Sequence, residues 1–223
     1  MPSERAPLSV VALISGSGSN LQALIDAQEQ GAPFRIRAVI SNEPEAFGLE
    51  RARRHGMATA VLNHRDYPDR ASFDAALAAA IDGYDPGLVV LAGFMRILTP
   101  AFVEHYRGRL FNIHPSLLPK HQGLHTHKRA LEAGDTEHGA SVHFVTAELD
   151  GGPVVLQARV PVRPGDDPGI LAARVLKQEH VIYPTVVRWF AEGRLRLDAD
   201  GRPNLDGEVL DEPRRIDLDQ GST

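Results

Sequence analysis

Two polar side chains, Asn112 and His114, stand two residues apart in the segment LFNIHPSLLP (residues 110–119). The apolar start of the segment predicts a strand, and Pro115 predicts its end because proline has no backbone N–H to donate. Side chains at positions i and i+2 of a strand point to the same face, so both groups can reach one reacting atom. A carboxylate, Asp150, follows later in the chain beside flexible glycines. Amide, imidazole and carboxylate together suffice for acyl transfer through a charged tetrahedral intermediate.

Each member of this trio has a chemical role and an ordinary structural alternative. Asn112 can donate a hydrogen bond to a developing oxyanion, and losing one such donor costs about a hundredfold or more in rate. A protonated His114 can do the same and then pass a proton to a leaving nitrogen, while Asp150 favours the charged ring. Taken singly, an asparagine before a turn often caps the local backbone, a histidine on a strand is often structural, and an Asp-Gly pair often forms a hairpin turn.

A glycine-rich loop, ISGSGSN (residues 14–20), follows the first apolar run. Gly16 and Gly18 allow a tight turn, and the exposed amides at a helix start favour an anion. Ser19 and Asn20 can either cap the helix or donate to phosphate oxygens. The loop has neither the third glycine of a dinucleotide fingerprint nor the Gly-Lys-Ser/Thr of a P-loop. The residues alone therefore leave two alternatives open, a monophosphate site and a plain glycine turn.

These groups need a scaffold, and apolar runs alternate with helical patterns along the first 120 residues. Near-continuous apolar runs are typical of parallel strands covered on both faces. The alternation predicts an α/β fold, a doubly wound Rossmann-like sheet that is mostly parallel, with ligands at the carboxyl ends of the strands. Strands are expected at residues 8–14, 36–40, 58–62, 88–91 and 110–113, and helices at 20–28, 47–55, 70–81 and 100–106.

Beyond residue 120 the pattern changes. Strands expected at 140–145 and 154–162, joined by the turn LDGGP, predict a C-terminal antiparallel hairpin. Asp167 and Pro168 predict the start of a long amphipathic helix that runs to about residue 190. We expect a single domain over residues 1–200 and a loose polar tail over residues 201–223. The remaining expected elements are a short helix at 124–133 and a short strand at 195–197.

The composition excludes several classes of protein. The 223 residues are 43% hydrophobic and 24% charged, which is ordinary for a soluble globular protein. A net charge of −5 argues against nucleic acid as a partner. The chain has no cysteine, so it offers no thiolate nucleophile and no sulfur ligand for zinc. The apolar run at residues 8–14 is too short for a signal sequence or a membrane span, so we expect no membrane partner and a cytoplasmic location.

Several segments together resemble one known family. They are ISGSGSN (14–20), VLAGFMRIL (90–98), FNIHPSLLP (111–119), GLHTH (123–127), HGASVH (138–143), LDGGP (149–153) and QEHVIYP (178–184). The chain resembles the phosphoribosylglycinamide formyltransferases, within the folate-dependent formyltransferase superfamily, from about residue 8 to residue 197. The resemblance implies direct transfer of a formyl group from 10-formyltetrahydrofolate to the amine of glycinamide ribonucleotide in purine biosynthesis, without a metal.

The same resemblance implies roles for particular residues. A nucleotide-phosphate half is expected at about 1–100 and a folate and catalytic half at about 85–197, in a monomer or homodimer acting on small molecules. Asn112, His114 and Asp150 are the implied catalytic set, and no direct chemistry is assigned to Ser116, Lys120 or His143. The implied nucleotide-binding residues are Gly18, Ser19, Asn20 and Glu179, and the implied folate-binding residues are Arg70, Met95, Arg96, Ile97, Leu98 and Asn112.

Alternatives from the residues remain. A methionyl-tRNA formyltransferase carries a further C-terminal domain and a formyltetrahydrofolate hydrolase an N-terminal one, for which we expect no room here. A non-catalytic phosphate-binding protein would leave the catalytic trio unexplained. A metalloenzyme would have to use His121, His125, His127 and His138, whose spacing matches no regular ligand pattern. The run Lys120-His121-Gln122 also departs from the family, which often has an aromatic residue or proline there.

Overall fold

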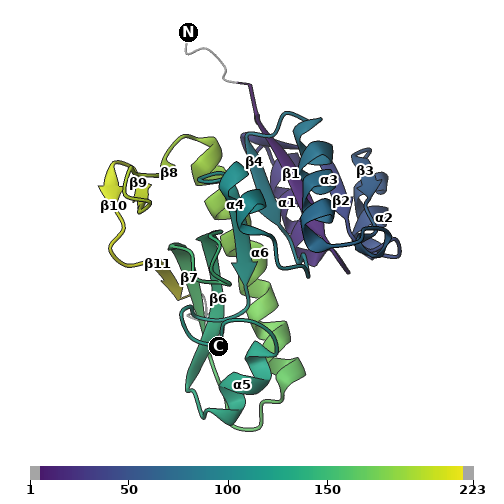
Figure 1. Cartoon of the computed structure of the whole chain (residues 1–223). Helices are drawn as coiled ribbons and strands as arrows, with labels where there is room; N and C mark the ends of the chain where they lie inside the picture. The colour runs from purple at the N-terminus through teal and green to yellow at the C-terminus, as the bar shows by residue number, and fades with distance from the viewer. Residues whose placement is uncertain (1–5, 218–223) are drawn as a thin grey trace.

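The computed structural model describes residues 6–217 and is built on an eight-stranded sheet of order β11-β7-β6-β5-β4-β1-β2-β3 (Figure 1). Strands β1 to β5 all run parallel to one another, whereas β6 is antiparallel to both of its neighbours, β5 and β7. The predicted α/β fold, mostly parallel with an antiparallel hairpin near its C-terminal end, is confirmed. The first strands are β1 (Leu8–Ile14), β2 (Phe34–Ser41), β3 (Ala58–Val61), β4 (Leu88–Leu91) and β5 (Leu110–His114), and the hairpin is β6 (Glu137–Phe144) and β7 (Val154–Pro161).

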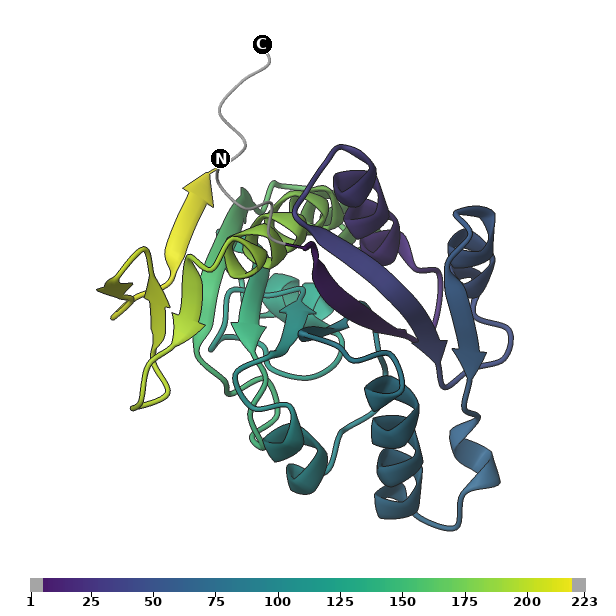
Figure 2. The same cartoon turned by 90° about the horizontal axis from the view of Figure 1, so that it is seen from above.

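Helices cover both faces of the sheet, and the alternation of side chains along β1 supplies both cores. Val10, Ala12 and Ile14 join one buried cluster, while Val11 and Leu13 join the other. Figure 2 shows α1 and α6 on one side of the sheet, with α3 and α4 on the other. The helices are α1 (Ser19–Glu29), α2 (Phe47–Arg54), α3 (Arg70–Asp82), α4 (Pro100–His105), α5 (Thr126–Glu132) and α6 (Pro168–Ala191), with a 3-10 turn at His64–Asp66.

Helix α6 ties the parallel and antiparallel parts of the sheet together. Its start is as predicted: the Asp167 side chain accepts a hydrogen bond from the backbone N–H of Ile170 at 2.8 Å, and Pro168 occupies the first turn. Further along, the buried Tyr183 hydroxyl donates to the carbonyls of Leu91 and Phe111, at 2.9 and 3.2 Å. The helix is thereby fixed against the last residue of β4 and the second residue of β5. No helix within residues 6–217 combines the length and apolar character needed to cross a membrane.

The expectation of a loose tail from residue 201 is wrong for residues 203–217. Strands β8 (Leu195–Leu197), β9 (Pro203–Leu205) and β10 (Glu208–Val209) form a small antiparallel sheet, and β11 (Arg214–Asp217) pairs in parallel with β7. The polar composition of this segment did not predict these strands, because an edge strand needs only backbone hydrogen bonds and one covered face. Residues 218–223 of the expected tail lie outside the described residues.

Candidate active site

Asn112 and His114 lie at the carboxyl end of β5, as predicted, where the sheet changes from parallel to antiparallel pairing. In the sheet register Asn112 is opposite Leu91 of β4 and His143 of β6. His114 is buried and the Asn112 side chain is half-buried. A polar pair at the end of a central strand is thus held by hydrogen-bonded strands on both sides.

The connection between β6 and β7 places Asp150 beside this pair. One carboxylate oxygen, Oδ2, lies 3.4 Å from His114 Nδ1 and accepts a hydrogen bond from the Gly123 N–H at 2.9 Å. The other oxygen, Oδ1, lies 3.5 Å from Asn112 Nδ2. The Asp150 side chain is only 8% exposed, so its charge interacts with these groups more strongly than it would in water. The structure therefore brings together the three residues that the sequence singled out.

The glycines after Asp150 act through close approach rather than through flexibility. A Cβ added at Gly152 would lie 1.9 Å from the carbonyl oxygen of Phe144, whereas the three atoms nearest to one added at Gly151 all belong to the flexible side chain of Glu148. Asp150 itself has φ of 49°, in the left-handed region that is costly for most residues but tolerated by Asp. The carboxylate is therefore presented by a tightly packed turn.

His143 is a neighbour of the trio to which sequence reasoning gave no role. Its Nδ1 donates to the carbonyl of Phe144 at 2.9 Å, and burial lowers the pKa of His143 well below its usual range. A neutral ring of that tautomer leaves Nε2 as an acceptor, and Asn112 Nδ2 lies 3.2 Å from it. The contact requires the Asn112 amide nitrogen, not its oxygen, to face the ring. No local pattern in the sequence indicates this contact, because the register that places His143 opposite Asn112 comes from the structure.

A cavity of about 100 Å³ opens beside Asn112 and His143. Of the residues implied for folate, Arg96, Ile97, Leu98 and Asn112 line it, and it continues along residues 145–150. Met95 is exposed next to it, and its N–H donates to Ser15 Oγ at 2.7 Å. Arg70 is exposed at the start of α3 and is not among the residues lining this cavity, so its contact with folate stays a prediction.

The glycine-rich loop turns sharply into α1. Gly18 has φ of 71° at the N-cap of α1, and a Cβ there would lie 2.6 Å from Gly48 Cα. Glycine is therefore required both by the conformation and by the approach of α2. Neither Ser19 nor Asn20 caps the helix, since the N-cap has no side-chain hydrogen bond. The alternative of a simple side-chain cap is thus removed.

Asn20 instead pairs with Glu179 of α6, far away in the sequence. Asn20 Nδ2 donates to Glu179 Oε2 at 2.6 Å, and both side chains are buried. Burial raises the pKa of Glu179, an effect that the Asn20 hydrogen bond opposes. Within residues 6–217 the buried Asn20 Oδ1 finds no hydrogen-bond partner. A buried amide oxygen without a partner is costly, which favours a ligand donor at this point.

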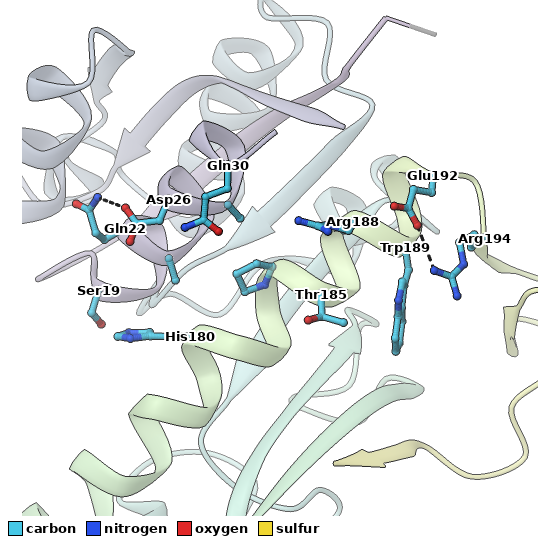
Figure 3. A pocket seen from close by; sticks show the side chains of 13 residues that line it. Ser19, Gln22, Asp26, Gln30, His180, Thr185, Arg188, Trp189, Glu192 and Arg194 are labelled. Carbon is cyan, nitrogen blue, oxygen red and sulfur yellow. Dashed lines mark hydrogen bonds and ion pairs between the residues drawn. The ribbon is translucent and has the colours of Figure 1, made fainter. Parts of the chain in front are cut away.

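A groove of about 640 Å³ runs between α1 and α6, and Ser19 and His180 line one end of it (Figure 3). Burial lowers the pKa of His180, and its Nε2 is buried without a hydrogen-bond partner among the described residues. Sequence reasoning missed His180, although it directly follows Glu179. Tyr183, one turn after Glu179 on the same face of α6, contacts the carbonyls of Leu91 and Phe111. Helix α6 therefore carries both Glu179 and, one turn later, a side chain that contacts β4 and β5.

The histidine cluster considered for a metal forms contacts among its own members. His127 Nδ1 lies 3.1 Å from His138 Nε2, and the His121 and His138 rings are 6.0 Å apart. Burial lowers the pKa of His138 to about 4, and that of His127 also falls. Over residues 6–217 no group of three or more His, Asp or Glu side chains has an arrangement suited to a metal ion.

Comparison with known proteins identifies the family to which this geometry belongs. The sequence profile of the formyl transferase family matches residues 8–187. Over 204 residues the chain is 59% identical to the phosphoribosylglycinamide formyltransferase of Escherichia coli (strain K12), covering 91% of this chain and 96% of the relative. The chain belongs to the phosphoribosylglycinamide formyltransferase family.

Solved structures of phosphoribosylglycinamide formyltransferases have the same fold. The structure of the Coxiella burnetii enzyme in complex with CHES superposes with a TM-score of 0.91 at 52% identity, covering 94% of this chain and 99% of the other. The chain is also 44% identical over 200 residues to the human trifunctional purine biosynthetic protein adenosine-3, of which it covers 20%. The family resemblance drawn from the sequence motifs is confirmed.

Proposed function

We propose that this chain transfers the formyl group of 10-formyltetrahydrofolate to the amine of glycinamide ribonucleotide, giving formylglycinamide ribonucleotide and tetrahydrofolate. The observation that carries the proposal is the convergence of Asn112, His114 and Asp150 at the end of β5. On one side of them lies a cavity, and near them on α6 lies a buried polar pair with an unsatisfied amide oxygen. The names of the relatives and the family fit this reaction.

The nucleotide would bind between the glycine loop and α6. Backbone amides at the start of α1, with the helix dipole, favour the phosphate near Gly18, Ser19 and Asn20. His180 lines the same groove and has a buried nitrogen available for hydrogen bonding. The Glu179 carboxylate would accept hydrogen bonds from ribose hydroxyls, and those hydroxyls can in turn donate to Asn20 Oδ1.

The folate would occupy the cavity beside Asn112, where it supplies the formyl group. The apolar side chains of Ile97 and Leu98 suit an aromatic ring system, and backbone groups of that loop can read its polar edge. Met95 and Arg96 belong to the same loop. Because the cavity lies beside Asn112, a donor bound there would present its formyl carbon to the Asn112 amide.

In the reaction the amine nitrogen forms a bond to the formyl carbon and the bond from that carbon to the donor nitrogen breaks. Asn112 would donate one amide proton to the oxyanion of the tetrahedral intermediate while His143 fixes the orientation of the amide. One proton leaves the attacking amine and one arrives at the departing nitrogen. The His114–Asp150 pair would hold the proton that leaves the amine and move a proton to the departing nitrogen. It would do so at His114 Nδ1, because His114 Nε2 is already hydrogen-bonded to the carbonyl of His121.

An assay with an acceptor control tests the proposal. Purified protein is mixed with a 10-formyl folate, with and without glycinamide ribonucleotide, and the deformylated folate is followed by absorbance. Product that forms only with the nucleotide is the expected result. Product without acceptor would indicate a hydrolase, and no product in either case would contradict the proposed reaction.

A further inference from the structure

The segment between β5 and α5 holds both members of the His114–Asp150 pair through its backbone. The carbonyl of His121 lies 3.0 Å from His114 Nε2 and accepts a hydrogen bond from its N–H. Two residues on, the Gly123 N–H donates to Asp150 Oδ2 at 2.9 Å, and Gln122 Nε2 donates to the Asp150 carbonyl at 3.3 Å. The geometry of the catalytic pair therefore depends on where residues 121–123 are held.

Asp135, in the turn between α5 and β6, anchors this segment through two side-chain contacts. Its Oδ2 lies 2.7 Å from His121 Nε2, and its Oδ1 lies 2.8 Å from Lys120 Nζ. These two hydrogen bonds lower the pKa of Asp135, which keeps the carboxylate ionised. The His121 and Asp135 side chains are only 13% and 14% exposed, whereas that of Lys120 is 63% exposed. Solvent therefore screens the lysine contact far more than the histidine contact.

The His121 backbone needs such an anchor. Its φ of 55° lies in the left-handed region, which costs free energy in a residue other than glycine or asparagine. The ring faces Asp135 on one side and the neutral His138 ring, 6.0 Å away, on the other. Arg129 holds the other end of the segment by donating to the Gln122 carbonyl, so removing the Asp135 contact should shift the segment without releasing it.

We propose that Asp135 and His121 form a positioning pair, in which the hydrogen bond between their side chains fixes the His121 carbonyl and thereby sets the orientation of the His114 ring toward Asp150. Neither residue touches the reacting atoms; both act through His114. The proposal rests on the proposed role of His114 and Asp150 in formyl transfer.

Three variants of the full chain test the pair. Asp135→Asn keeps the shape and removes the charge, and His121→Asn removes the reach to Asp135 while tolerating the left-handed backbone. Each should lower kcat by roughly tenfold to a hundredfold, since small misplacements of catalytic groups have effects of that size, and leave KM for both substrates within about twofold. Lys120→Met is the matched control, because it removes the other partner of Asp135, and it should change kcat by less than about twofold.

Nitrogen-15 NMR of histidine-labelled protein supplies a readout independent of turnover. In the wild type and in Lys120→Met, His114 Nε2 should carry a hydrogen-bonded proton; in the other two variants that signal should weaken or exchange with solvent. Wild-type kcat in Asp135→Asn, an unchanged His114 signal in that variant, or an equal loss in Lys120→Met would overturn the proposal. If the wild type transfers no formyl group, the proposed function fails, and the NMR comparison alone still decides the positioning claim.

Discussion

The groups proposed to hold the nucleotide stand on helices: Asn20 lies in the first turn of α1 and Glu179 lies in α6. In the antiparallel half of the sheet, Asp150 stands in a turn, and His114 is held through a segment outside any helix or strand. The groups proposed to bind the nucleotide are thus fixed by helices packed on the core, whereas the His114 ring and the Asp150 carboxylate are oriented by hydrogen bonds to backbone groups of His121 and Gly123. Substitutions of the first groups should therefore weaken binding, and substitutions of the second should slow chemistry.

The largest effect is expected at the catalytic trio. His114→Ala should lower kcat by about 10²–10⁴-fold, the range for loss of a general acid–base group, and Asp150→Asn should act in the same direction. Asn112→Ala should cost about a hundredfold or more through loss of an oxyanion donor. Steady-state kinetics with circular dichroism as a folding control provides the check. Wild-type-like turnover in His114→Ala would remove this residue from the mechanism.

Gly152→Ala should have the next largest effect because its Cβ would overlap the Phe144 carbonyl oxygen. We expect a loss of about 2 kcal/mol in unfolding free energy, typical of overpacking, and a fall in kcat as Asp150 moves. Gly151→Ala is the matched control, since its Cβ meets a flexible side chain that can shift. Denaturant unfolding of both variants measures the difference. Equal stability of the two would show that the turn is not rigid.

Glu179→Gln should act on binding and leave chemistry intact. Loss of the carboxylate acceptor should raise KM for the nucleotide by roughly tenfold, with kcat nearly unchanged, as for a group that binds ground and transition states equally.

Burial raises the pKa of Glu179 above its ordinary 4.5, so the folded chain favours the protonated form of Glu179 more than the unfolded chain does. Stability from this group is present below pH 4.5 and is lost as pH rises through the folded value. The variant should therefore be relatively more stable than wild type at pH 7 than at pH 4, as thermal unfolding would reveal.

The smallest effect concerns pH and the buried histidines. The pKa of His138 falls from 6.5 to about 4 through burial, so between these values the unfolded chain binds a proton that the folded chain does not. Stability should fall as pH drops from about 6.5 toward 4. His138→Gln should flatten that slope in thermal unfolding measured across the range. An unchanged slope would mean that other groups set the acid sensitivity.

The sequence predicted the fold well where local pattern and burial agree. The run Leu8–Ile14 is apolar except for Ser9, and the structure gives β1 the same bounds. The pair Asn112 and His114 could be placed on one face because strand periodicity and Pro115 fix the strand end. Strand β11 was missed because Arg214–Asp217 carries no apolar pattern, and its order comes from pairing with β7.

The rest of the site depends on contacts that no local pattern encodes. Asn20 and Glu179 meet across 159 positions, and only the family resemblance assigned them to one ligand. The side chain of Asp150 reaches His114 because of a left-handed backbone and the packing of Gly152. His143 and His180 received no role because a histidine on a strand or helix is ordinary until its neighbours are known. The sequence therefore singled out the candidate reactive residues, and packing supplied the groups that orient them.

The most direct test of the division between binding and catalysis is formyl transfer at saturating nucleotide and folate, compared between Glu179→Gln and Asp150→Asn. At saturation, Glu179→Gln should approach the wild-type rate because only binding was weakened, whereas Asp150→Asn should remain slower by about a hundredfold or more. A Glu179→Gln enzyme that stays equally slow at saturation, or an Asp150→Asn enzyme that recovers, would contradict the account.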